Sequence, residues 1–166
     1  MKPLFTIVGL LSLVGAATAV HAETFHVEAV MSPKEQMQLD FQDGSKHFVL
    51  MVRREGNASG AGALNEAKVV EYGMHDIVPG VGGEPRGYLV FTRADGAIAY
   101  VKWQVRAVFV TGPEGKPVLL DNGFWEIAGA TGGLSGMTGA GTLHIKAVSP
   151  TDRKFILDGD LVAKKQ

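Results

Sequence analysis

Two titratable residues, Glu126 and His75, are the main candidates for acid–base chemistry. Glu126 lies between Trp125 and Ile127, so on a strand it faces away from both. If that face lines a lumen, desolvation favours the protonated carboxyl and makes Glu126 an acid or base; otherwise it is a surface charge. His75 precedes Asp76, but neighbours on a strand point to opposite faces, so the two need not touch.

Other reactive groups are scarce. The chain has no cysteine, which excludes a thiolate nucleophile, a disulfide framework and a cysteine zinc site. The histidines beyond residue 22 show no His-x-x-x-His spacing, and Gly-x-Ser-x-Gly is absent. The glycine-rich stretch does not end in Gly-Lys-Ser/Thr, so it is not a nucleotide loop. We predict no metal and no cofactor.

Aromatic residues supply the candidates for ligand binding. Residues 97–110 alternate an apolar face containing Trp103 and Phe109 with a polar face containing Lys102 and Arg106. We expect the apolar face to look inward and the two cations to be solvated; a polar lumen would instead place them against a ligand carboxylate or phenol. Both indoles are either plain core or a stacking platform. The predicted ligand-binding residues are Trp103, Trp125, Tyr88 and Phe109.

The elements that would position these residues are almost all strands. Period-two patterns and turn residues predict strands at 23–30, 45–55, 62–72, 86–93, 97–110, 117–128, 141–148 and 154–163. Turns are expected at 42–44, 94–96, 112–115 and 149–152, a short helix or turn from Ser32, and longer loops at 56–62 and 72–86. We predict an all-β, eight-stranded antiparallel up-and-down barrel, with a two-sheet sandwich as the rival.

A glycine-rich stretch carries a family resemblance. The stretch runs Trp-x-Ile, then Gly-x-Thr-Gly, then Gly-x-x-Gly-x-Gly-Thr. Its matching positions are Gly129, Thr131, Gly132, Gly136, Gly139, Gly141 and Thr142. It resembles the corresponding segment of allene oxide cyclases, dirigent proteins and their bacterial secreted relatives. The resemblance implies a barrel with an apolar lumen that holds a reactive or hydrophobic small molecule. Catalytic residues of those families cannot be placed on this chain, so no activity is carried over.

The first 22 residues have the pattern of a secretory signal. Lys2 supplies a positive start, residues 4–14 an apolar run too short to span a bilayer, and Val20-His21-Ala22 a cleavage site. We predict a signal peptide at 1–22, a single barrel domain at 23–166, a periplasmic or secreted location, and no stable membrane anchor after cleavage. The alternative is an uncleaved anchor. Removing Lys2 leaves 15 basic against 17 acidic residues, which argues against nucleic acid as a partner.

Three functions fit these patterns. The first is an exported barrel that binds a hydrophobic or aromatic small molecule in its lumen. The second is a cyclase, isomerase or coupling-guide enzyme that uses the same lumen. The third is a structural module of the envelope, with a lumen filled by its own side chains. Residues 48–52 and 88–91 are apolar on both faces, which predicts a homo-oligomer, dimer or trimer, unless loops cover them.

Overall fold

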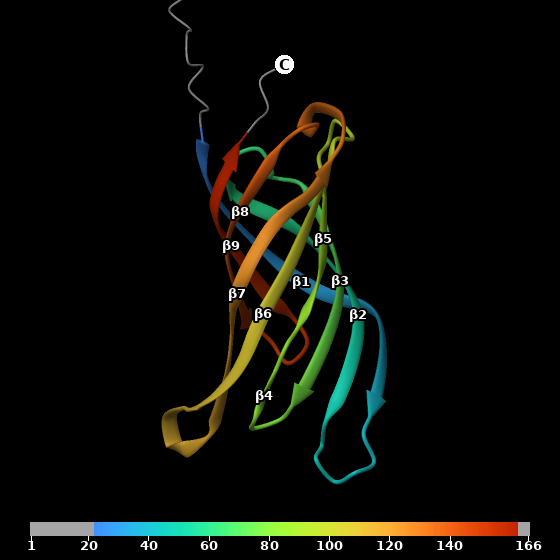
Figure 1. The fold of residues 1–166 in the computed structure, drawn as a ribbon, viewed down its shortest axis with the longest axis vertical. Coiled ribbons are helices and arrows are strands. Elements are labelled where there is room, and N and C mark those ends of the chain that lie inside the picture. Colours follow the sequence, from blue (N-terminus) through green and yellow to red (C-terminus); the bar gives the residue numbers. More distant parts are fainter. Residues whose placement is uncertain (1–21, 163–166) are drawn as a thin grey trace, which may run out of the picture.

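The computed structural model describes residues 22–162, and the predicted signal segment lies outside them except for Ala22. Figure 1 shows long, strongly twisted strands wrapped into one barrel. The elements are β1 (Ala22–Asp40), β2 (Phe48–Ala61), β3 (Lys68–Val78), β4 (Gly82–Gly83), β5 (Arg86–Thr92), β6 (Ile98–Thr111), η1 (Pro113–Gly115), β7 (Pro117–Ala130), η2 (Gly132–Leu134), β8 (Thr138–Ala147) and β9 (Arg153–Val162). No helix within 22–162 is long and apolar enough to cross a membrane.

The strands form a closed antiparallel barrel, as the sequence predicted. The pairing runs β1, β2, β3, β5, β6, β7, β8, β9, and β9 pairs back onto β1. Eight strands therefore make the ring, and β4 is a two-residue addition between β3 and β6. Because every neighbouring pair is hydrogen-bonded in one sheet, the two-sheet sandwich is excluded.

Three local predictions were wrong. The Ser32 segment is a continuation of β1, with a bulge between Pro33 and Glu35, because cross-strand pairing with β2 overrides the helix-start pattern. The loop expected at 56–62 belongs mostly to β2, which continues to Ala61. The loop expected at 72–86 is mostly β3 and β4, so His75 stands on a strand rather than in a mobile connection.

The lumen is filled at one end and hollow at the other. Inward-facing residues alternate along each strand, and buried loop residues close the end of the barrel at which Ala22 pairs with Val162. These buried loop residues are Leu64, Ala67, Ala97, Leu134 and Met137. The opposite end is framed by the turns at 41–47 and 112–116. Within the lumen, space for a small molecule is therefore found at that open end.

Two glycines make room for an indole inside the filled half. Trp125 packs edge-on against Phe25, with ring centroids 5.2 Å apart. A side chain at Gly159 would lie 2.8 Å from the Trp125 ring, and one at Gly141 would meet the Gly159 backbone at 2.7 Å. Gly141, a glycine of the family-like stretch and the cross-strand partner of Trp125, thus serves the close packing of β8 against β9 beside this indole.

Candidate functional site

A cavity of about 180 Å³ lies in the hollow end of the lumen. Strands β2, β3, β6, β7, β8 and β9 all contribute to its wall, together with Pro79 beyond β3. The apolar lining residues are Phe48, Leu50, Ile77, Pro79, Phe109, Leu119 and Ile145, and the polar ones are Arg54, His75, Asp121 and Arg153. The cavity therefore combines an apolar wall with a group of titratable side chains.

One part of the polar group is a buried network on β2 and β3. Arg54 Nη1 donates to Glu71 Oε2 at 2.7 Å, and Glu71 has no solvent exposure. His75 Nε2 lies 3.1 Å from the other carboxylate oxygen of Glu71. His75 Nε2 also lies 3.3 Å from Arg54 Nη1, so this ring nitrogen faces both an acceptor and a donor of the network. Arg54 Nε has no hydrogen-bond partner among the described residues.

Asp121 is the second part, and it lacks the partners that Glu71 has. It is only 9% exposed, and Oδ1 has no hydrogen bond within residues 22–162. Burial raises the pKa of Asp121 from 3.8 to about 6, while the nearby positive charges of His75 and Arg153 act to lower it. A buried carboxyl without a hydrogen bond is costly. Asp121 is therefore the group in this cavity that a hydrogen bond from a ligand would stabilise most.

Arg153 is a cation without a carboxylate within 4.0 Å in the described part of the chain. Its Nη1 donates to the backbone oxygens of Asp152 and Ser149, at 2.9 and 3.2 Å. Burial lowers the pKa of Arg153, and the positive charge of Arg54 lowers it further. Arg153 thus offers positive charge at the cavity, close enough to act on the pKa of Asp121.

The structure separates the residues that the sequence singled out. His75 and Phe109 line the cavity. Trp103 is buried beside it, 5.9 Å from the His75 ring and 5.8 Å from Phe155, and its Nε1 has no partner in the described structure. Trp125 lies opposite Trp103 on the next strand; both indoles belong to the filled core, and neither lines the cavity.

Two other candidates lie outside the lumen. Tyr88 is on the outer surface of β5 and is 44% exposed. Glu126 is exposed on β7, with its carboxylate 3.4 Å from Lys102 Nζ. Glu126 is therefore a surface charge rather than a lumen acid, and Lys102 and Arg106 are solvated as expected.

Sequence reasoning missed four lumen residues, namely Arg54, Glu71, Asp121 and Arg153. A signal was present in the strand phase. Arg54 follows the buried Val52 by two residues, and Glu71 follows the buried Val69 by two. Charged residues in phase with an inward-facing apolar set are the period-two mark of a polar lumen.

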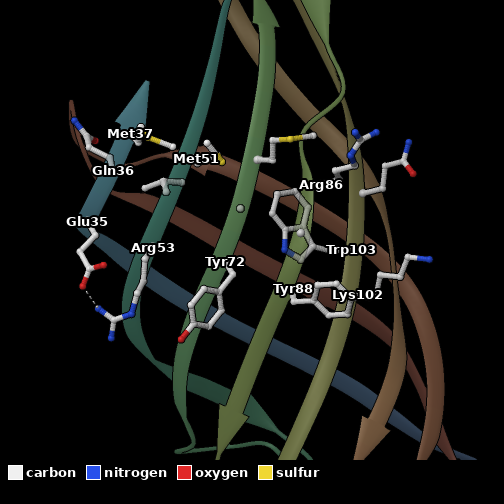
Figure 2. Close-up of a pocket in the computed structure, with 15 residues that line it drawn as sticks. Glu35, Gln36, Met37, Met51, Arg53, Tyr72, Arg86, Tyr88, Lys102 and Trp103 are labelled. Carbon is white, nitrogen blue, oxygen red and sulfur yellow. Dashed lines mark hydrogen bonds and ion pairs between the residues drawn. The ribbon is translucent and has the colours of Figure 1, made fainter. Parts of the chain in front are cut away.

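A second and larger hollow of about 710 Å³ lies on the outer wall, across β1, β2, β3, β5 and β6. Figure 2 shows Met37 beside Met51 on the first two strands, and Tyr72 and Tyr88 on the wall beyond them. Tyr72 and Tyr88 are cross-strand partners. We call this surface the outer groove.

Comparisons with known proteins support the fold and nothing finer. No family model and no curated protein matches the sequence. Among solved structures, the pterocarpan synthase dirigent protein GePTS1 is similar with a TM-score of 0.52 and 12% identity, over 95% of this chain and 97% of that one. A protein of unknown function from Clostridium acetobutylicum gives 0.55 and 8% over 89% and 99%, and another from Rhodopseudomonas palustris gives 0.52 and 15% over 87% and 99%. The chain has the allene oxide cyclase/dirigent-like barrel fold.

Proposed function

We propose that the hollow end of the barrel binds a compact small molecule with an apolar body and a hydroxyl head. The observation that carries this proposal is Asp121, a carboxyl in the cavity that is nine-tenths buried and has no hydrogen bond in the described structure. A ligand O–H that donates to Asp121 satisfies this group, and a ligand oxygen also accepts from the unpartnered Arg54 Nε.

The wall and the size of the cavity restrict the body of the ligand. Phe48, Phe109 and Leu119 belong to its apolar lining. An apolar cavity of about 150 Å³ accommodates benzene. The cavity of about 180 Å³ therefore suits a single ring with small substituents. Small-molecule sites commonly combine such a wall with a few placed polar groups.

A matched pair of probes tests whether the cavity prefers a ligand that carries a hydroxyl. 4-Ethylphenol carries the O–H donor, and 4-ethylanisole replaces it with a methyl ether. We expect 4-ethylphenol to bind about 10- to 100-fold more tightly, because a hydrogen bond to a charged group contributes roughly 1.5–3 kcal/mol. Titration calorimetry measures both affinities. The Asp121→Leu variant should lose the preference, whereas Glu126→Gln, which changes a carboxylate outside the lumen, should keep it.

Two outcomes contradict this proposal. Equal affinity for the two probes would show that Asp121 does not recognise a donor. No binding of either probe would favour the structural module, in which the lumen serves only to hold the barrel together.

Proton transfer is a second candidate function, favoured by the titration of Asp121 near neutral pH. Burial raises its pKa to about 6, which suits an acid or base at physiological pH. Asp121 would take a proton from the carbon beside a ligand carbonyl, and Arg153 would stabilise the enolate oxygen that results. Acetophenone in D₂O is a suitable probe, since exchange of its methyl protons is visible by NMR. We expect Asp121→Asn to slow exchange by roughly 100-fold with binding retained; an unchanged rate would rule out this role.

We also propose that the protein is exported and that cleavage follows Ala22. The support is the charged start, short apolar run and small residues of the first 22 positions. The intact mass of the protein isolated from the envelope or medium tests this proposal. A mature chain that begins at Glu23 agrees with it, and a chain that retains Met1 in the envelope contradicts it.

A further inference from the structure

Half of the methionines in the sequence stand in one row across the outer groove. The chain has six methionines, and Met37, Met51 and Met74 are direct cross-strand partners on β1, β2 and β3. All three line the groove, and Met37 and Met51 are 61% and 44% exposed. Methionine side chains are flexible and polarisable, and they suit surfaces that adapt to an apolar ligand. This methionine row therefore favours an apolar occupant of adaptable shape.

The methionine row continues into a cation that has no carboxylate partner. Met74 lies opposite Arg86 on β5, and Arg86 lies opposite Gln104 on β6. The guanidinium of Arg86 makes no ion pair with any residue from 22 to 162. A guanidinium binds a carboxylate through paired N–H donors. The row thus has an apolar end on β1 to β3 and a cationic end on β5.

The charges along the groove favour an anionic occupant. Its charged lining residues are Glu35, Arg53, Arg86 and Lys102, three cations against one carboxylate. Arg53 is already paired with Glu35, at 3.4 Å, and Lys102 lies 3.4 Å from Glu126 outside the groove. The whole chain has a net charge of -1, so the groove is locally positive on a chain that is not. Arg86 is the lining cation left to bind an anion.

The other wall of the groove is a pair of tyrosines. Tyr72 and Tyr88 are direct cross-strand partners and are 54% and 44% exposed. In Figure 2 they lie across the groove from Met51. Gly73 and Gly87, the residues next to them, are also cross-strand partners, and they project no side chain into the groove. An extended chain therefore has room to lie between the methionine row and the tyrosines.

We propose that the outer groove binds an unbranched fatty acid, with its carboxylate at Arg86 and its chain along the methionine row. Neighbouring strands are about 4.8 Å apart, so Met37 lies roughly 14 Å from Arg86, across three strand spacings. The extended chain of dodecanoate has about this length. Contact with the row favours the chain because it removes apolar surface from water. This site lies on the outer wall and is separate from the lumen cavity of about 180 Å³.

Two ligands with the same chain test the head group. Dodecanoate carries a negative charge and dodecyltrimethylammonium a positive one, and titration calorimetry below the micelle concentration measures both affinities. We expect dodecanoate to bind more tightly by about 5-fold or more, because it pairs with Arg86. Arg86→Gln should remove about that factor from the affinity for dodecanoate alone. Arg106→Gln, which changes an arginine on β6 outside the groove that is paired with Glu84, should have no effect.

A second pair of variants tests the chain. Met51 and Val108 are exposed to nearly the same extent, 44% and 43%, but Val108 lies on β6 outside the groove. We expect Met51→Ser to weaken binding of dodecanoate by about 5-fold, because apolar contact with the chain is lost. Val108→Ser should leave the affinity unchanged. Because both side chains are exposed, neither variant should alter the melting temperature.

A lumen variant separates this site from the cavity. Phe109 lines the lumen cavity and not the outer groove. We expect Phe109→Ala to leave the affinity for dodecanoate unchanged. A larger loss with Phe109→Ala than with Met51→Ser would place the chain in the lumen and overturn the proposal. This result does not depend on whether the lumen binds a hydroxyl ligand, so the two proposals can fail separately.

Other occupants of the groove would give different results. Equal affinity for the two ligands, or equal losses in Arg86→Gln and Arg106→Gln, would contradict the role of Arg86. A dimer that dissociates in Met51→Ser, without binding of dodecanoate, would assign the groove to a second copy of the chain. Binding to phosphatidylglycerol vesicles without binding of free dodecanoate would assign it to a membrane surface.

Discussion

Arg54 and Glu71 form an ion pair inside the barrel, with Arg54 Nη1 2.7 Å from the Glu71 carboxylate and both side chains buried. The pair links β2 to β3, where Arg54 lies directly opposite Glu71. The next residues along the two strands, Glu55 and Val70, are also cross-strand partners. Each charge is tolerated in the lumen only because the other neutralises it.

Removal of one partner should be far more damaging than removal of both. We expect Glu71→Leu to lower the free energy of unfolding by about 3–5 kcal/mol, because Arg54 is left as an uncompensated buried charge. Adding Arg54→Met should recover most of that loss. Urea unfolding of the two variants measures this effect. Glu84→Gln, which breaks the exposed pair with Arg106, serves as the control and should cost less than about 1 kcal/mol. A double variant less stable than Glu71→Leu would contradict the argument.

Asp121 should make the stability of the barrel depend on pH. Its pKa is raised from 3.8 to about 6 in the folded state, so the folded state holds this proton more tightly than the unfolded chain does. The stabilisation that this proton contributes to the folded state is therefore fully present below about pH 4 and is lost as the pH rises through about 6. At about 1.4 kcal/mol for each unit of pKa, the loss is roughly 3 kcal/mol.

The Asp121→Asn variant isolates this effect, because all other titrating groups are shared. The stability of the natural chain relative to the variant should fall between pH 4 and pH 7 in chemical denaturation. Parallel curves for the two proteins would show that Asp121 is solvated rather than buried.

The barrel itself could be predicted from the sequence, since alternation and turn residues are local signals. Trp103 and Phe109 share a phase with the apolar residues of β6, and the structure places both inward. The bulge in β1 could not be predicted, because Ser32-Pro33 is equally a helix start. Only pairing with β2, residues distant in sequence, decides between the two structures.

The site could be predicted only in part. Of the predicted residues, His75 and Phe109 line the candidate cavity. The burial of Arg54 and Glu71 was not predicted, because charged residues are buried only when a partner exists. That partner comes from another strand, and the register of β2 against β3 that brings the two residues together cannot be read from the sequence. Glu126 remained undecided for the same reason, because its role depended on which face of β7 looks inward.

Gly136 should tolerate alanine poorly, because its backbone is left-handed, with φ of +77°. An L-residue in that conformation costs about 1–2 kcal/mol. Gly133, in the same turn, is a matched control. It does not have a positive φ, and an added Cβ would meet only Asp95, at 3.7 Å. We expect Gly136→Ala to be less stable than Gly133→Ala by about that amount in urea unfolding. Equal stabilities would remove the turn-conformation argument.

Phe109 and Tyr88 distinguish a lumen ligand from one bound on the outer wall. Phe109 lines the lumen cavity, whereas Tyr88 lines the outer groove. We expect Phe109→Ala to weaken binding of 4-ethylphenol by roughly 10-fold or more, because burial of a phenyl side chain contributes about 1.5–3 kcal/mol. Tyr88→Ala should leave the affinity unchanged in the same calorimetric titration. The reverse order would move the ligand to the outer groove and leave Asp121 without a role in recognition.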